Sequence, residues 1–358
     1  MELFCYQAEC GDAVRIRYIG NDGNPHNIFL DSGYERTYGN ILRQEIKKLI
    51  QAGEIIDLWI VSHIHDDHIG GLMKYIRSVD KEEIQNVVKE WYYNPPRNWT
   101  AKFVVKQENN SFAMSIKQSD RFYNFLKRNN KLPKKDITSD LGIQEFFGMK
   151  IHILSPTTTI LSELRDKYKT EIPFQSNEID EISTAKAIFQ NDYDKKIEEF
   201  NLDKFFEDIS LENRSSISVL FEYQNRTILW LADSHPSVVS ASLIRKGYSK
   251  NNPLICDYVI LSHHASKGNN NTSLFNLIEC CNYIISSNGE NKHRLPNKEV
   301  LARIIRHKNR DFSKLYSLWF TYDTYNLRDI FNSDGVDADQ EWNLKLIYSN
   351  SSFLYLEL

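Results

Sequence analysis

The sequence predicts an α/β protein in which short apolar strands alternate with amphipathic helices. The clearest strand is the continuous apolar run at residues 58–61, which is typical of a buried strand. The clearest helix covers residues 39–52, whose apolar side chains recur at helical spacing. Two halves with this order of strands and helices flank a central region of different character. A chain of 358 residues can bury a sizeable core and could hold one large or two ordinary domains. Of these two possibilities we predict one domain over residues 1–358.

The other elements follow from local patterns of apolar and turn residues. Alternating or continuous apolar runs bounded by Gly, Asn, Asp and Pro predict strands. These are expected at residues 2–7, 12–19, 27–30, 57–62, 87–93, 150–154, 215–223, 227–231, 257–261, 282–286, 315–322, 343–347 and 353–356. Helices are expected at residues 39–52, 69–77, 119–128, 236–245, 273–281 and 297–307.

Two insertions interrupt this order, at about residues 95–144 and 157–212, and we expect them to form a cap or a partner surface. The first carries a basic cluster that we interpret as a solvated turn: Lys127, Arg128, Lys131, Lys134 and Lys135. In the second, residues 178–212 hold eleven acidic residues against four lysines, with aromatic spacing that predicts helices over an apolar face. Such an acidic cover would repel a polyphosphate chain, which favours a protein partner there.

Composition limits the class of protein. A formal net charge of -4 does not indicate an overall basic surface of the kind that binds nucleic acid. The five cysteines have no C-x-x-C spacing and are expected to be reduced thiols. The amino terminus lacks the pattern of a signal peptide, and no apolar run is long enough to span a bilayer. We therefore expect a cytoplasmic protein without a membrane partner.

The strongest functional signal is residues 61–71, reading VSHIHDDHIGG. His63 and His65 are two residues apart, so in extended backbone their side chains point to the same side and reach one metal ion. Asp67 and His68 follow at the start of a helix and would face a second ion. The two glycines after them, at positions 70 and 71, let the backbone pass close to the cluster.

Three distant segments end in the same manner, with polar ligand-type residues after an apolar strand. Asp233 follows residues 228–231, His263 and His264 follow residues 258–261, and His293 lies shortly after residues 283–285. A carboxylate can bridge two ions and imidazoles suit zinc, so these strand ends supply the remaining ligands of a two-ion site.

The turn at residues 61–71 resembles the signature of the metallo-β-lactamase superfamily, which implies an αββα sandwich with a two-metal hydrolytic site. The order of "GD", "LDSG", "SHIHDDHIGGL", "ILWLADSHP", "DYVILSHHASKGNN" and "SSNGENKHRLP" is similar to the hydrolase domain of ComEC-type competence proteins and their stand-alone relatives. This resemblance implies that Asp233 bridges the ions and that His263 joins Asp67 and His68. It also implies that His264 and Lys267 lie in the outer shell or face the substrate.

The chain departs from that pattern at three positions. Ser155 stands where the superfamily usually supplies a third histidine to the ion of His63 and His65. His152 is nearby, but we interpret it as a packed or exposed strand residue. Ala232 replaces a glycine before the bridging aspartate, and Leu295 replaces a histidine before proline. The spare candidates for a missing ligand are His293 and His235.

We therefore predict a metal-dependent hydrolase with two divalent ions, Zn²⁺ or Mn²⁺, which acts as a phosphodiesterase or nuclease on a nucleotide or a short nucleic acid. A hydroxide held between the ions would attack phosphorus. Asp67 would orient it, Lys267 would neutralise developing charge, and His264 or His293 would protonate the leaving group. The alternatives are hydrolysis of a carbon ester, such as a lactone or thioester, and a metal-binding interaction protein with a weakened site.

Overall fold

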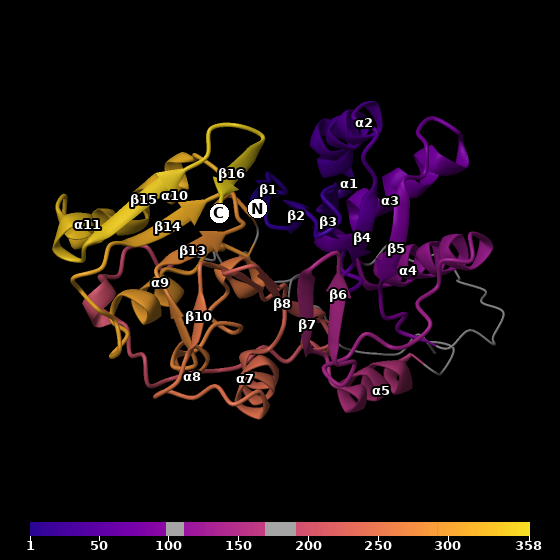
Figure 1. The fold of residues 1–358 in the computed structure, drawn as a ribbon. Coiled ribbons are helices and arrows are strands. Elements are labelled where there is room, and N and C mark those ends of the chain that lie inside the picture. Colours follow the sequence, from indigo (N-terminus) through magenta and orange to yellow (C-terminus); the bar gives the residue numbers. More distant parts are fainter. Residues whose placement is uncertain (98–110, 169–190, 292) are drawn as a thin grey trace.

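The computed structural model describes residues 1–97, 111–168, 191–291 and 293–358, and its centre is a pair of β-sheets (Figure 1). The first sheet has six strands, in the order β16-β1-β2-β3-β4-β5. These strands are β1 (Glu2–Tyr6), β2 (Ala13–Ile19), β3 (Pro25–Asp31), β4 (Ile56–Ile60), β5 (Val88–Tyr92) and β16 (Phe353–Glu357). β3, β4 and β5 run parallel, so their carboxyl ends lie at one edge.

The second sheet has eight strands, in the order β15-β14-β13-β11-β9-β8-β7-β6. Its strands are β6 (Ile143–Phe146), β7 (Met149–Ser155), β8 (Ser218–Tyr223), β9 (Arg226–Trp230), β11 (Tyr258–Ile260), β13 (Asn282–Ile285), β14 (Tyr316–Phe320) and β15 (Leu344–Tyr348). The run from β9 through β11 to β13 is parallel, which again gathers carboxyl ends at one edge. A small separate pair joins β10 (Leu254–Cys256) to β12 (Ile278–Cys280).

Helices cover the outer face of each sheet. In Figure 1 α2, α3 and α4 lie beside the strands β3 to β5, and α7, α8 and α9 lie beside the second sheet. The bounds of the longer helices are α2 (Arg43–Gln51), α3 (Asp66–Asp80), α4 (Ser111–Arg128), α5 (Thr158–Lys167), α7 (Pro236–Arg245) and α9 (Lys298–Ile305). The shorter ones are α1 (Glu35–Thr37), η1 (Tyr38–Leu42), η2 (Ile197–Glu199), α6 (Leu211–Arg214), η3 (Ser262–Ala265), α8 (Thr272–Phe275), α10 (Tyr325–Arg328), η4 (Asp329–Asp334) and α11 (Ala338–Glu341).

Three apolar clusters hold these layers together. One lies between the sheets and pairs side chains such as Ile16 and Leu58 with Phe221 and Trp230. The other two lie between each sheet and its helices. This arrangement is the predicted αββα sandwich, and the predicted fold class is confirmed. None of the described helices has the length and apolar character needed to cross a bilayer.

Two local expectations were wrong. The predicted helix at residues 273–281 ends at Phe275, because Ile278–Cys280 form a strand that pairs with β10. In the second insertion, residues 169–190 lie outside the described part of the chain. The remainder of the acidic stretch, residues 191–212, has only short helices and packs Tyr193, Ile197 and Phe200 against the core of the second sheet.

Candidate metal centre

The turn after β4 is fixed by very close backbone packing. A Cβ atom placed on Gly11 would lie 2.1 Å from the carbonyl oxygen of Asp67, and one on Gly71 would lie 2.2 Å from the carbonyl oxygen of Ser32. Only glycine fits at such distances. The two glycines after the histidines were expected to let the backbone pass close to the ligand cluster, but the close contact at Gly71 is with the backbone of Ser32. Helix α3 begins directly after His65, with Asp66 and Asp67 in its first turn.

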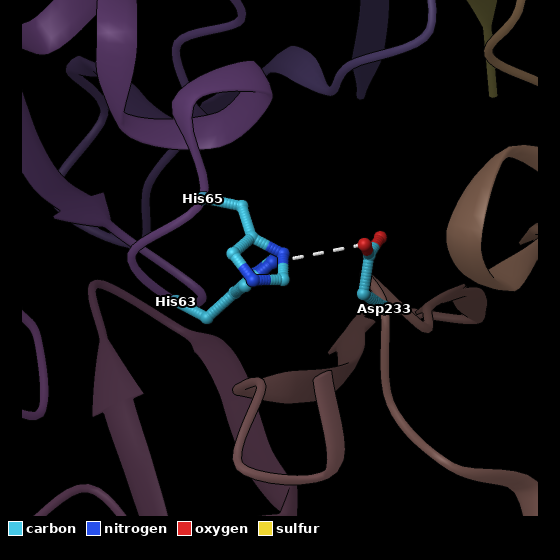
Figure 2. A group of neighbouring side chains, drawn as sticks. All are labelled: His63, His65 and Asp233. Carbon is cyan, nitrogen blue, oxygen red and sulfur yellow. Dashed lines mark ion pairs between the residues drawn. The ribbon is translucent and has the colours of Figure 1, made fainter. Parts of the chain in front are cut away.

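Loops that follow β4, β9 and β11 bring ligand-type side chains from both sheets to one place. Among the described residues, three groups have ligand atoms that all lie within 4.8 Å of one another, and one of them is Asp12, Asp31 and His68. The other two each combine side chains from both sheets. The first is His63, His65 and Asp233, and the second is Asp67, His68 and His264. Figure 2 shows the two histidines of the first group directed toward Asp233 from the opposite sheet.

Asp233 lies between the two groups and turns one oxygen toward each. Its Oδ2 is 3.7 Å from Nε2 of His63, and its Oδ1 is 3.3 Å from Nε2 of His68 and 3.7 Å from Nε2 of His264. Neither oxygen has a hydrogen-bond partner among the described residues, although the side chain is 1% exposed. A buried carboxylate without partners is costly, so this geometry calls for cations on both sides.

Asp31, at the end of β3, orients the neighbouring imidazoles. Its Oδ2 accepts from Nδ1 of His68 at 2.6 Å and from the hydroxyl of Ser62 at 2.6 Å. Since the single Ser62 proton is used in this way, the Ser62 oxygen accepts from Nδ1 of His63 at 3.0 Å. Both Nε2 atoms are then free to act as ligands toward Asp233, which is the usual arrangement of outer-shell partners around metal-binding histidines.

The electrostatic environment is strongly perturbed. Burial, together with His68 and His65, holds the pKa of His63 well below its usual range, so this imidazole is neutral. Burial opposes protonation of His68, but Asp233, Asp67 and Asp31 raise its pKa well above the usual range. Burial raises the pKa of Asp31 to about 6, although His68 and Ser62 oppose the shift. Three carboxylates around one imidazole form a field that favours a bound cation.

These residues fit a pair of divalent ions. The Nε2 atoms of His63, His68 and His264 are buried without hydrogen-bond partners among the described residues, as are both oxygens of Asp233. Two ligand atoms on one tetrahedral ion lie about 3.3 Å apart when bond lengths are about 2.0–2.2 Å. The distances of 3.3–3.7 Å from Asp233 to the three imidazoles are close to that value. Imidazole and carboxylate donors suit zinc and manganese.

The structure gathers the predicted metal ligands His63, His65, Asp67, His68 and Asp233. His264, which the sequence placed outside the ligand set, lies with Asp67 and His68, with its Nε2 at 3.5 Å from Asp67 Oδ2. The predicted ligand His263 is in neither that group nor the group of His63, His65 and Asp233, although its Nε2 lies 3.7 Å from Asp233 Oδ2. The ligand assignment itself remains a prediction.

The other candidates lie at the margin of the centre or away from it. His293 and Lys267 are exposed, and neither is in a ligand group among the described residues. Ser155 is buried, with its hydroxyl 3.5 Å from the carbonyl of Arg214. His152 bonds Glu222 at 2.7 Å through Nε2, as expected for a packed strand residue. His235 is buried, with Nε2 3.7 Å from Asp208.

Sequence reasoning gave no role to several residues that support the centre. Asp31 and Asp12 lie beside His68 and His264, respectively. Asp31 belongs to the sequence stretch "LDSG" and Asp12 to the stretch "GD", so both stretches could have indicated these residues. Asn269 bonds both His263 and the carbonyl of Asp233. Asp208, inside the acidic insertion, lies 3.7 Å from Nδ1 of His263. Asn269 lies in the stretch "DYVILSHHASKGNN", whereas nothing local in the sequence marks Asp208.

A family model describes the first part of this architecture. Residues 19–160 match the model of the metallo-beta-lactamase superfamily. The matched segment contains the turn with His63, His65, Asp67 and His68, and it ends before Asp233.

No curated protein matches the chain. Among solved structures, a mutant of CmlA beta-hydroxylase is similar over 100% of this chain and 54% of that chain, with 13% sequence identity and a TM-score of 0.40. The chain thus spans about half the length of that structure.

Proposed function

We propose that this protein is a dinuclear metal-dependent hydrolase that cleaves phosphodiesters. One observation carries the proposal. Asp233 is a buried carboxylate whose two oxygens face two separate sets of ligand-type side chains, as a bridging ligand must. The family match over residues 19–160 supports the coarser class of metal-dependent hydrolase.

When bound, two divalent ions in such a site polarise a phosphoryl oxygen and lower the pKa of water. Asp67 is the residue of this chain that is placed to orient water. Burial opposes its ionisation, but His68 and His264 hold the pKa of Asp67 below its usual range, so it is an anion that accepts a hydrogen bond. Its side chain is 20% exposed, unlike the fully buried His68, and so it borders the solvent.

The surroundings support a small anionic substrate that carries a base. Lys267 follows the two histidines after β11, and its side chain is exposed, with no ion pair among the described residues. The backbone of Phe206 lies beside Gly268, next to Lys267, and the Phe206 ring is 85% exposed. An exposed ring and an exposed cation on adjoining backbone segments suit a nucleobase and its phosphate.

The same edge carries Glu207 and Asp208, and these charges disfavour a long polyphosphate chain. We therefore propose a nucleotide or short single-stranded substrate, or a partner protein that brings a basic surface. Duplex binding at several salt concentrations tests this, because each phosphate contact steepens the log-log salt dependence by roughly one unit. A shallow slope is expected, and tight binding with a steep slope would contradict the proposal.

The reaction is tested with a substrate panel in added Mn²⁺ or Zn²⁺. Hydrolysis of bis-p-nitrophenyl phosphate, short single strands or cyclic nucleotides is expected, and faster hydrolysis of thioesters or lactones would favour the carbon-ester alternative. Asp67→Ala should abolish the activity while circular dichroism and thermal melts in chelator stay unchanged. Wild-type turnover in that variant would show that the site is misassigned, and an absence of bound metal would favour an interaction protein.

A further inference from the structure

The first ligand group contains two imidazoles and one carboxylate, His63, His65 and Asp233. We propose that His263 supplies a third imidazole to this group, while the adjacent His264 serves the group of Asp67 and His68. The inference rests on the two-ion centre proposed above and assigns its ligands. It replaces the predicted assignment, in which His263 joins Asp67 and His68.

The distances to Asp233 separate the four imidazoles into two pairs. His63 and His263 each place Nε2 3.7 Å from the same oxygen, Oδ2. In contrast, His68 and His264 face Oδ1, at 3.3 and 3.7 Å. Each oxygen of Asp233 thus faces two imidazoles. This pattern is expected of a carboxylate that bridges two ions.

Hydrogen bonds around Asn269 fix which nitrogen of His263 carries the proton. The amide NH₂ of Asn269 donates to the carbonyl of Asp233 at 3.1 Å and to Oδ2 of Asp208 at 3.2 Å. Its carbonyl oxygen is therefore the atom 2.9 Å from Nδ1 of His263, and an amide oxygen only accepts. Nδ1 of His263 must donate, so in the neutral ring Nε2 presents a lone pair toward Oδ2 of Asp233. Two acceptors that face one another at 3.7 Å need a cation between them.

Asp208, which lies in the acidic insertion, also helps to hold the imidazole of His263 in place. Its Oδ2 lies 3.7 Å from Nδ1 of His263 and accepts from the amide of Asn213 at 2.6 Å. Its backbone amide donates to the carbonyl of Gly268 at 3.1 Å, which ties the insertion to the loop after β11. A carboxylate behind a ligating histidine fixes the ring and raises its basicity.

The backbone explains how two adjacent histidines reach different sides of one carboxylate. His263, His264 and Ala265 all have positive φ, at 47°, 55° and 64°. The two rings are consequently 5.7 Å apart at their centroids and nearly perpendicular, at 78°. Left-handed backbone at three successive non-glycine residues is costly and is typical of functional sites.

Metal counting in double variants tests the assignment without measuring activity. The full chain is dialysed against a fixed competing chelator, and Zn²⁺ is measured by elemental analysis with circular dichroism as the control of fold. Wild type should keep about two equivalents, and His65→Ala and His263→Ala should each keep about one. If His263 and His65 serve the same ion, the double variant should also keep about one equivalent. His65→Ala with His264→Ala should keep almost none.

Each outcome decides something. Loss of both ions from His65→Ala with His263→Ala would place His263 on the second ion and overturn the inference. Two equivalents in His263→Ala, with wild-type affinity, would do the same. Less than half an equivalent in wild type would instead overturn the two-ion centre, and this inference with it. His152→Gln is the matched control, since the imidazole of His152 on β7 bonds Glu222 on β8, and the variant should keep two equivalents.

Asn269 gives a milder test of the same geometry. Asn269→Ala removes the acceptor that sets the His263 tautomer but leaves every proposed ligand in place. The affinity of one ion should fall about 10- to 100-fold, the range typical for loss of an outer-shell partner, while the other ion is retained. Unchanged affinity at both sites would contradict the proposed role of Asn269.

Discussion

The two segments that supply the histidines of the centre are built in different ways. The turn after β4 carries its ligand-type residues within positions 63–68, and the backbone is held by glycines in near contact with neighbouring carbonyls. The loop after β11 carries two adjacent histidines in left-handed backbone, and its support comes from Asn269 and from Asp208 in the insertion. The first segment gathers its ligand-type residues within six positions and packs tightly against the backbone of β-strand ends, whereas the second is supported by hydrogen-bonding side chains, one of them in the insertion.

This difference predicts where the centre tolerates change. His68 is fully buried and bonded to Asp31, whereas the His263 side chain is 25% exposed and borders the insertion. In the proposed two-ion centre, the turn after β4 therefore sets where the ions would bind. The loop after β11 can be adjusted through the insertion, and we expect substrate choice to lie on that side.

The largest effect should come from substituting Asp233, because its two oxygens face ligand-type side chains from both segments. Asp233→Asn leaves one carbonyl oxygen where two anionic oxygens faced two ligand groups. We expect both ions to be lost to a competing chelator and phosphodiester hydrolysis to fall by at least about 1,000-fold, which corresponds to about 4 kcal/mol of transition-state stabilisation. Elemental analysis and the hydrolysis rate measure this. A variant that keeps one tight ion would show that Asp233 serves only one segment.

Gly11→Ala tests the rigid packing of the turn after β4. The new Cβ atom would lie 2.1 Å from the Asp67 carbonyl, so the turn must shift. We expect about 1–3 kcal/mol of lost stability, typical of overpacking, and weaker binding of the ion held by Asp67. Thermal unfolding and chelator competition measure these. Gly39→Ala is the control, because its Cβ atom would meet mainly the flexible end of Lys74, and a loss of the same size there would contradict the account.

Phe206→Ala tests whether the side of the insertion selects the substrate. The ring is 85% exposed, so the fold and the metal content should not change. Loss of base stacking of about 1–3 kcal/mol should raise KM for a nucleotide roughly 5- to 100-fold, with little change for bis-p-nitrophenyl phosphate. Ile209→Ala, at a side chain that is 97% exposed, is the control. If Phe206→Ala raises KM equally for the nucleotide and for bis-p-nitrophenyl phosphate, the ring does not stack on a base.

The smallest effect is expected at Ala232, just before Asp233. Its φ of 46° explains why glycine would be the easier residue there. Ala232→Gly relieves about 1–2 kcal/mol of left-handed strain but adds unfolded-state entropy and removes a buried methyl group of about 0.8 kcal/mol. The free energy of unfolding should therefore change by less than about 1 kcal/mol, with metal content unchanged. A larger loss, measured by denaturant unfolding, would mean that the methyl group positions Asp233.

Local patterns predicted most strands and the turn with His63, because each depends on neighbours in sequence. The layered αββα arrangement was predicted from the family resemblance. Buried strands such as β4 and β9 read directly as apolar runs that end in polar residues. The resemblance placed His263, and not His264, with Asp67 and His68, whereas the structure places His264 there. The sequence could not show this, because the two positions depend on left-handed backbone at non-glycine residues and on Asn269. The strand at Ile278–Cys280 was missed because a short apolar run next to a helix has no decisive period, and pairing with β10 decided its form.

Mn²⁺ titration followed by low-temperature electron paramagnetic resonance tests the central claim most directly. Two ions bridged by one carboxylate lie about 3.5–4 Å apart, close enough for magnetic coupling. The account predicts saturation near two equivalents of Mn²⁺ with an exchange-coupled spectrum in wild type and no coupled signal in Asp233→Asn. Saturation of the wild-type protein with an uncoupled mononuclear signal, or binding below half an equivalent, would contradict the claim that Asp233 joins two metal ions.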